Sequence, residues 1–220
     1  MRQKIGIIGS TGSGKSSIIG LNPRLYDVKE GEILIDGTNI KQLDIKRLRE
    51  QMGVVTQTAT IFSGSVGTNI VQGKKDANIE ELDGAIKKAQ AEEFIVQYDD
   101  LFNHEVKQNG TNLSGGQKQR ISIARAFVRN PKVLIFDDST SAVDAKSEEY
   151  ILNEIDKVAG STTTIMIAQK ISTVSQMDRI IVLNNIGSID GFDTHENLMK
   201  NSGVYKEIAL SQIGGGAQDA

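Results

Sequence analysis

The sequence has no cysteine, only two histidines and no apolar run long enough to cross a membrane. The absence of cysteine excludes disulfides and thiol chemistry, and it fits a cytosolic compartment. If a membrane is involved, another polypeptide or segment must span it. A surplus of positive charge is also missing: the formal net charge is −3, which argues against a nucleic-acid-binding surface. The 220 residues predict one domain at 1–213, followed by a disordered tail at 214–220 that has nothing to bury.

A glycine-rich turn follows the first apolar run. Residues 4–8 predict a buried strand, and the next six predict a tight loop: Gly9, Ser10, Thr11, Gly12, Ser13 and Gly14. Glycines let backbone N–H groups turn inward around phosphate oxygens, and a helix opening at Lys15 adds its partial positive charge. In such a loop Lys15 reaches the β- and γ-phosphates, Ser16 ligates Mg²⁺ and Ser17 contacts the α-phosphate. The pattern predicts a nucleotide-phosphate site.

Two acids end a second apolar segment. The apolar residues 133–136 lead into Asp137 and Asp138, which is typical of a central parallel strand whose carboxyl end meets a ligand. Asp137 is therefore predicted to hold Mg²⁺, through water. The alternative is that these acids end the strand for structural reasons alone.

A helix start with two glycines at its mouth is predicted at Ser114-Gly115-Gly116-Gln117. Ser114 can cap the helix, and Gln117, three residues later, can complete a capping box. Apolar residues at spacings of three and four then continue the helix to Val128, before Asn130 and Pro131. A capped helix that opens on two glycines favours anion binding.

Residues 113–120, Leu-Ser-Gly-Gly-Gln-Lys-Gln-Arg, together with the glycine-rich loop upstream, resemble the ATP-binding-cassette (ABC) nucleotide-binding domains. The resemblance runs from Ile5 to about Leu210. It implies an α/β, RecA-like P-loop NTPase fold with a mostly parallel sheet. A helical signature subdomain at about 63–129 and a truncated antiparallel β subdomain would accompany that sheet. ATP and Mg²⁺ are the implied cofactors. Residues 114–117 would bind the γ-phosphate of ATP held by a partner domain, so two such domains would meet head to tail.

Other segments resemble further family elements in the expected order. Gln57 corresponds to the Q-loop glutamine, which contacts Mg²⁺ and couples to a transmembrane domain. Asp144 corresponds to the D-loop at the dimer interface. Tyr26 and Phe62 lie in sequence segments that resemble those of exporter-type domains. The alternative is that both side chains serve only in ordinary packing. The resemblance therefore implies a transmembrane partner and a place at the cytoplasmic face of the cell membrane.

Two positions depart from the family. Asp137 corresponds to the family's Walker B aspartate. The family's catalytic base is a glutamate directly after that aspartate, whereas this chain has Asp138. Loss of one methylene retracts the carboxylate by about 1.5 Å, and a general base must lie within hydrogen-bond reach of its water. The family's switch histidine follows the strand predicted at 163–168, where this chain has Gln169. Glutamine can hydrogen-bond a γ-phosphate but carries no positive charge. His104 and His195 lie elsewhere, and His195, at a probable helix start, is interpreted as structural.

Asp138 and Gln169 together resemble the degenerate subunit of heterodimeric exporters, which keeps an intact signature and has weakened hydrolytic groups. On this interpretation the chain binds Mg-ATP, hydrolyses it poorly and lends its signature to a different subunit. The alternative is a fully competent ATPase of a homodimeric exporter in which both substitutions are tolerated. Family domains also carry two edge strands and an adenine-stacking aromatic residue before the first strand seen here. We therefore expect the chain to be a piece of a longer transporter.

Overall fold

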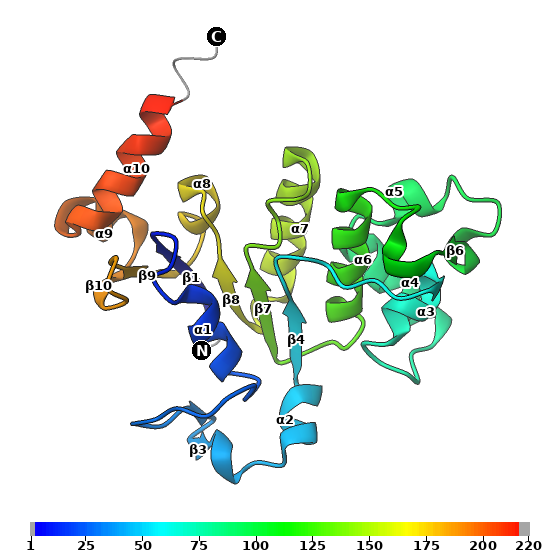
Figure 1. Cartoon of the computed structure of the whole chain (residues 1–220), viewed down its shortest axis with the longest axis horizontal. Coiled ribbons are helices and arrows are strands. Elements are labelled where there is room, and N and C mark those ends of the chain that lie inside the picture. Colours follow the sequence, from blue (N-terminus) through cyan, green and yellow to red (C-terminus); the bar gives the residue numbers. More distant parts are fainter. Residues whose placement is uncertain (1–2, 216–220) are drawn as a thin grey trace. The chain divides into compact units, whose positions relative to one another are not determined.

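The computed structural model describes residues 3–215 and divides the chain into two compact units (Figure 1). The terminal unit comprises Met1–Leu48 and Thr163–Ala220, and the internal unit comprises Arg49–Thr162. The helical subdomain predicted at about 63–129 falls within the internal unit. Of the predicted tail, residues 214 and 215 end the last helix, and residues 216–220 lie outside the described residues.

Four strands form the sheet of the terminal unit. β1 (Lys4–Gly9) pairs in parallel with β8 (Thr163–Ile167) on one side and with β9 (Arg179–Leu183) on the other. β10 (Ile189–Asp193) pairs antiparallel with β9. Three consecutive residues of β1 are buried, as expected of a strand covered on both faces. Because β1 and β8 are parallel neighbours, the loops that follow them leave the same edge of the sheet.

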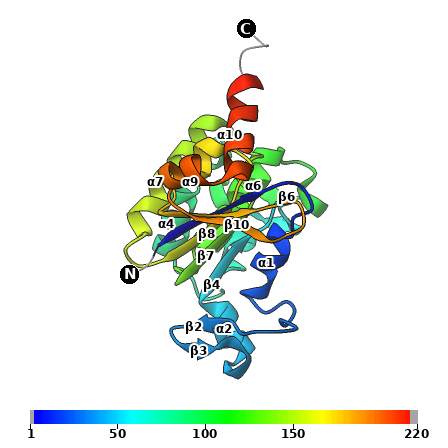
Figure 2. The same cartoon turned by 90° about the vertical axis from the view of Figure 1, so that its left-hand side faces the viewer.

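Helices cover both faces of this sheet. α1 (Lys15–Leu21) lies on one face, and the helices that follow β8 and β10 lie on the other, as Figure 2 shows. These are α8 (Ile171–Val174), α9 (His195–Asn201) and α10 (Gly203–Gly215). His195 begins α9, as the sequence predicts, and its Nδ1 lies 2.8 Å from the hydroxyl of buried Tyr205.

The terminal unit also contains a small antiparallel hairpin. β2 (Leu34–Ile35) pairs with β3 (Thr38–Asn39) across an Asp36-Gly37 turn. Both turn residues have positive φ, 49° and 77°, which is the conformation that an Asp-Gly hairpin turn favours. The short helices η1 (Ile40–Gln42) and α2 (Ile45–Glu50) follow.

The internal unit combines a parallel strand pair with a group of helices. β4 (Met52–Val55) pairs with β7 (Val133–Asp137), and Val55 lies opposite Phe136, so the segments after both strands leave the same edge. β5 (Gly64–Ser65) and β6 (Glu105–Val106) form a short antiparallel pair. The helices are α3 (Val66–Val71), α4 (Ile79–Lys88), α5 (Glu92–Ile95), α6 (Gly115–Phe127), α7 (Ala145–Val158), η2 (Leu101–Asn103) and η3 (Gln108–Gly110).

Side-chain caps fix where most of the longer helices of this unit begin. Ser65, Asn78 and Ser114 each accept a hydrogen bond from the backbone of the third helical residue, whose side chain bonds back to complete a capping box. The box at Ser114 confirms the sequence prediction. Among the described residues, no helix is long and apolar enough to cross a membrane.

A buried polar network joins α3 to α6. The guanidinium of Arg125 donates to the Asn69 backbone oxygen at 2.8 Å, to the Asn69 Oδ1 at 3.0 Å and to the Thr60 oxygen at 2.8 Å. Asn69, which is 1% exposed, also accepts from the Phe62 N–H and donates to the Phe62 and Ser65 oxygens. Burial lowers the pKa of Arg125. A partly buried cation is tolerated where its nitrogens find acceptors, and here Nε and both terminal nitrogens each donate to the helix or to the segment before it.

Candidate functional site

The glycine-rich loop connects β1 to α1 with the helix start that the sequence predicts. Gly14 is the residue before the helix and has φ 88°, while Gly12 has φ 83°. Side chains disfavour these left-handed conformations, which explains glycine at both positions. A Cβ built on either glycine would meet nothing within 4 Å. The loop therefore has open space beside its backbone, as a phosphate cradle requires.

Lys15 lies at the start of α1 and bends back over this loop. Its Nζ donates to the backbone oxygens of Gly9 at 2.8 Å and Ser10 at 2.7 Å. The ammonium therefore lies among the loop residues, from where it can serve a bound phosphate. Ser16 and Ser17 are exposed in the first turn of α1, so their hydroxyls are accessible.

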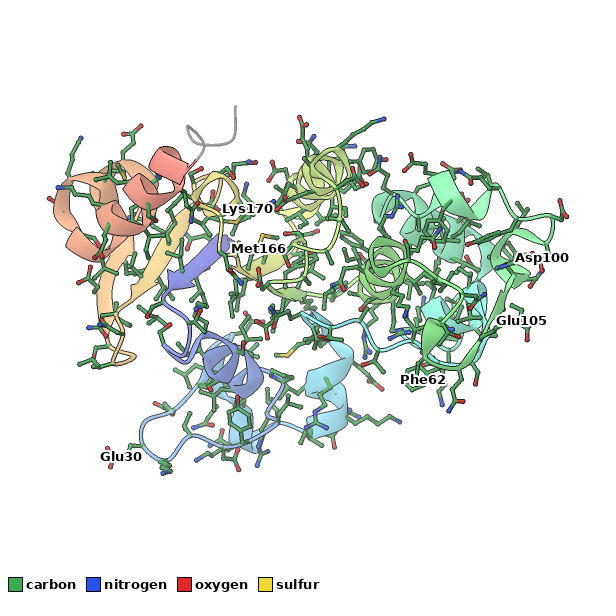
Figure 3. All side chains as sticks on the ribbon, turned by 45° about the horizontal axis from the view of Figure 1, so that its top comes forward. Glu30, Phe62, Asp100, Glu105, Met166 and Lys170 are labelled. Carbon is green, nitrogen blue, oxygen red and sulfur yellow. The ribbon has the colours of Figure 1, made fainter. Side chains whose placement is uncertain are left out.

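Gln169 emerges beside the glycine-rich loop. It follows β8, the parallel neighbour of β1, and Ile7 lies opposite Ile167 in the register. Met166 and Lys170, which bracket Gln169, are labelled in Figure 3. The residue is exposed, and its backbone oxygen accepts a 2.7 Å hydrogen bond from the Gln212 side chain. The terminal unit therefore brings the predicted phosphate loop and the switch position to one sheet edge.

The internal unit brings Gln57 to the pair of acids that ends β7. Gln57 follows β4, the parallel neighbour of β7, and its Nε2 donates to Asp138 Oδ2 at 3.2 Å. Asp138 is 8% exposed and has φ 48°. Aspartate is one of the few non-glycine residues that readily adopt this conformation. The Ser141 hydroxyl donates to the Asp138 backbone oxygen at 2.8 Å. Asp137 is the last residue of β7 and is half-buried.

The signature residues form the start of α6. The Ser114 N–H donates to Gln117 Oε1 at 2.9 Å, and the Gln117 N–H donates to Ser114 Oγ at 3.2 Å. Gly115 is exposed, and a Cβ built on it would meet nothing within 4 Å. The first turn of α6 is therefore open to an approaching ligand. Buried Gln119, to which the sequence analysis gave no role, donates from Nε2 to the Thr56 oxygen at 3.1 Å and ties this helix to the segment that carries Gln57.

Asp144 has a structural task in this chain. Its Oδ1 accepts from the Ser147 N–H at 2.9 Å and its Oδ2 from the Ser147 hydroxyl at 2.7 Å, so the carboxylate caps α7. These hydrogen bonds, led by that from the hydroxyl, lower the pKa of Asp144. Its place at a dimer interface stays a prediction.

The predicted Mg²⁺ ligands fit that ion in kind. Ser16, Gln57 and Asp137 offer a hydroxyl, an amide oxygen and a carboxylate, all hard oxygen donors. Mg²⁺ in nucleotide sites takes one or two such protein ligands and completes its shell with phosphates and water. Within the described part of the chain, no group of three or more His, Cys, Asp or Glu could hold a metal ion by itself.

Residues 1–141 match the family model described as ABC transporter. The putative multidrug export ATP-binding/permease protein YgaD of Bacillus subtilis is 44% identical over 210 residues, which are 96% of this chain and 36% of that protein. Multidrug resistance protein pgp-1 of Caenorhabditis elegans is 43% identical over 210 residues, 96% of this chain and 16% of its own length. The structure of a bacterial Atm1-family ABC exporter with ATP bound superposes with a TM-score of 0.92 at 39% identity, covering 96% of this chain and 37% of that chain.

The superposition confirms the predicted fold class. It extends over nearly the whole chain, so the α/β, P-loop NTPase architecture with a mostly parallel sheet is shared with a solved exporter. The chain spans little more than a third of that exporter and of YgaD, and less than a fifth of pgp-1.

Proposed function

This chain belongs to the ABC transporter family, and from that premise we propose that it is the ATP-binding domain of an exporter. It binds Mg-ATP and pairs head to tail with a second such domain to power a transmembrane partner. Two of its relatives are named for multidrug export or resistance, and the solved relative is an exporter with ATP bound. The substrate class and the identity of the partner are set outside this chain.

Each group of residues has a distinct task in this proposal. Lys15 neutralises the β- and γ-phosphates, and the Ser16 hydroxyl is a Mg²⁺ ligand; Gln57 and Asp137 are the oxygen ligands that the internal unit offers. The open first turn of α6, which begins at Gly115, presents backbone N–H groups to the γ-phosphate of the partner's ATP, and Ser114 lies beside them. Mg²⁺ supplies charge neutralisation between the phosphates when it is bound.

We further propose that hydrolysis at this chain's own site is weak. The observation that carries this proposal is the environment of Asp138: its short carboxylate is buried and accepts from Gln57, on a left-handed backbone. A base held this way is poorly placed to take a proton from a water that a longer glutamate would reach. Gln169, at the switch position, offers an amide in place of a cation. The signature, by contrast, keeps its full pattern, so the chain would serve mainly as the weakly hydrolysing half of a heterodimer.

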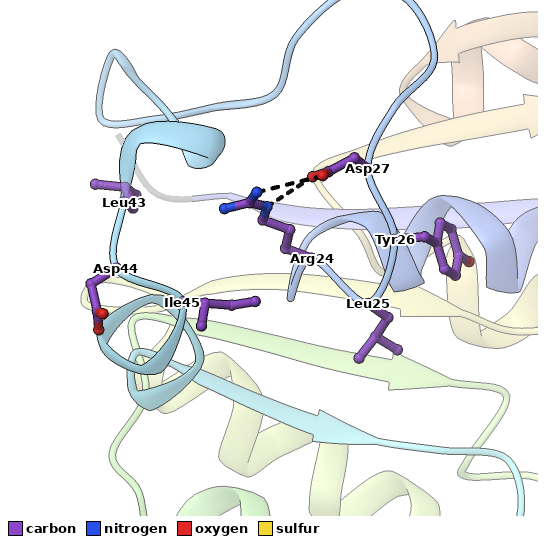
Figure 4. A pocket seen from close by; sticks show the side chains of 7 residues that line it. All are labelled: Arg24, Leu25, Tyr26, Asp27, Leu43, Asp44 and Ile45. Atoms are coloured by element: carbon purple, nitrogen blue, oxygen red, sulfur yellow. Dashed lines mark hydrogen bonds and ion pairs between the residues drawn. The ribbon is translucent and has the colours of Figure 1, made fainter.

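A transmembrane partner and a cytoplasmic location at the membrane are part of the same proposal. An open pocket of the terminal unit is lined by the side chains labelled in Figure 4. Leu25 and Ile45 are 65% and 40% exposed there, beside the ion pair of Arg24 and Asp27 at 2.8 Å. Exposed apolar side chains rimmed by charges suit contact with another protein segment. Tyr26 is partly explained by packing, because its ring lies against Gly20 and its hydroxyl donates to the Ser17 oxygen.

The test is steady-state ATPase activity of the assembled transporter with changes in this chain only. Ser114→Arg places bulk where the partner's γ-phosphate must bind, and we expect turnover to fall by about a hundredfold or more. Lys15→Ala removes the phosphate-binding ammonium of this chain's own site, and we expect most of the turnover to remain. Asn78→Arg, at the capping box of α4, is the matched control for adding an arginine at a helix start and should leave turnover unchanged.

The competing proposal is a competent homodimer with two equivalent sites, in which either change would damage both. Equal loss with Lys15→Ala and Ser114→Arg would therefore overturn the weak-site proposal and favour the competent ATPase. Failure of the wild-type transporter to hydrolyse ATP at all would overturn the proposed function itself.

A further inference from the structure

α10 is firmly anchored to the rest of the terminal unit. Tyr205 is fully buried and Ala209 is 2% exposed. The Tyr205 N–H donates to Ser202 Oγ at 2.9 Å, and the Ser202 hydroxyl donates to Asp190 Oδ2 at 2.5 Å. Gln212 follows Tyr205 by seven residues and Ala209 by three, so all three side chains lie on one face of the helix. The buried face of α10 therefore directs Gln212 toward its contacts in α8 and the segment before it.

Gln212 caps α8 from another helix, because the residue before α8 does not do so. The residue before α8 is Lys170, whose side chain makes no capping hydrogen bond. The first N–H groups of a helix need an acceptor from outside the helix. Gln212 Oε1 accepts from the Ile171 N–H at 2.8 Å and meets this need from another helix.

The same amide also holds the switch position. Gln212 Nε2 donates to the Gln169 backbone oxygen at 2.7 Å. One side chain therefore fixes the backbone on both sides of Lys170, immediately after buried Ala168 at the end of β8. Because β8 lies beside β1, the segment at 168–171 leaves the sheet at the edge where the glycine-rich loop begins.

We propose that Gln212 is a positioning residue for segment 168–171, which presents the Gln169 side chain to the γ-phosphate of this chain's own nucleotide. The inference rests on the proposed function, because it assumes that the terminal unit binds ATP. A backbone held by two hydrogen bonds limits the directions that the Gln169 side chain can take, and recognition of one phosphate group depends on such placement. α10 thereby becomes part of the apparatus that distinguishes ATP from ADP.

The test compares ATP and ADP affinities of the full chain, with Mg²⁺, by calorimetry. Their ratio isolates the γ-phosphate, because contributions from adenine, ribose and the other phosphates cancel. We expect Gln169→Ala to lower the preference for ATP and Gln212→Ala to lower it by roughly two- to tenfold, the range that one or two hydrogen bonds would produce. Ser211→Ala is the matched control: it removes a hydroxyl that bonds only within α10, to the Ile208 oxygen, and should leave the ratio unchanged.

A double-mutant cycle separates positioning from a merely structural role. If Gln212 acts through Gln169, Gln212→Ala will cause no further loss of ATP preference in a Gln169→Ala background. Gln212→Glu provides a second variant that keeps an acceptor for the Ile171 N–H but places an anionic oxygen against the Gln169 carbonyl. We expect it to lower the ratio at least as much as Gln212→Ala.

Three results would overturn the inference: an unchanged ratio in Gln212→Ala and Gln212→Glu, a further loss in the double variant, or no effect of Gln169→Ala. Failure of the wild-type chain to bind either nucleotide would overturn the proposed function together with it. Binding of both nucleotides with an unchanged ratio in the variants would overturn the inference alone.

Discussion

The signature of this chain and its own hydrolytic positions are held in different ways. The signature is local: Ser114 and Gln117, three residues apart, close a capping box on each other. The hydrolytic positions depend on amides from far along the chain, since Gln57 reaches Asp138 across 81 positions and Gln212 reaches Gln169 across 43. A motif that is stabilised by its own residues can contribute to a partner's ATP site even when the hydrolytic positions of its own chain have changed. Gln212 holds the backbone of residue 169, so the side chain there can change its chemistry while the backbone stays in place; Gln57 instead contacts the Asp138 carboxylate itself.

The largest effect on turnover should come from replacing Asp138 and Gln169 with the residues that the family has at these positions. Asp138→Glu with Gln169→His returns a longer base and a titratable ring, and we expect turnover at this site to rise roughly a hundredfold to a thousandfold. The measurement is ATP hydrolysis by the assembled transporter whose partner site has been inactivated. Adding Lys15→Ala to the double variant is the control and should remove the gain. No gain with ATP still bound would place the weakness outside these two residues.

Asn69→Ala tests a second long-range arrangement. It removes the partners of Arg125 and of the Phe62 backbone at once, and we expect the free energy of unfolding to fall by about 3 kcal/mol. Ile70→Val is the matched control, because it trims a fully buried neighbour on the same helix and should cost about 1 kcal/mol. Both values come from urea unfolding. Equal losses would mean that the polar network adds nothing beyond packing.

The anchor of α10 predicts a pH dependence. Burial raises the pKa of Tyr205 from 10.0 to about 12. Below pH 10 the Tyr205 hydroxyl is protonated in both the folded and the unfolded chain, so the contribution of Tyr205 to the free energy of unfolding is fully present. Above pH 10 the unfolded chain loses the proton first, and unfolding becomes easier by up to roughly 3 kcal/mol as the pH approaches 12. The Tyr205→Phe variant has no hydroxyl to ionise at this position, so its free energy of unfolding does not fall for this reason. The difference in unfolding free energy between the two proteins, measured at pH 9 and pH 11.5, should therefore shift in favour of the variant. A constant difference would contradict the expectation.

The smallest effect is expected at the capping box of the signature helix. Ser114→Ala removes half of a capping box and should lower the free energy of unfolding by about 1 kcal/mol. Asn78→Ala does the same at α4, and the two losses should agree if the first turn of α6 is held by its capping box alone. A clearly larger loss at Ser114 would reveal support for that first turn from outside the box and weaken the comparison.

Local patterns account for what the sequence predicted correctly. The helix starts at Lys15 and after Ser114, and the strand beginning at Thr163, follow from glycine conformation, caps and apolar runs. The bond from Gln57 to Asp138 and the clamp by Gln212 could not be predicted, because glutamine at a distant position carries no spacing signal. The Asp144 cap was different: an acid three residues before a serine is a helix-start pattern that could have been recognised.

The pairing of β1 has a consequence for how the chain is made. β1 leaves the ribosome before the internal unit, but its partners, β8 and β9, are synthesised only after the whole of that unit. Domains tend to fold as they emerge, so the internal unit can fold while β1 is still unpaired. During that interval the apolar run Ile5-Gly6-Ile7-Ile8 offers an open strand that can aggregate. Chaperone binding to nascent chains should therefore be strongest at this segment and end once β9 has emerged.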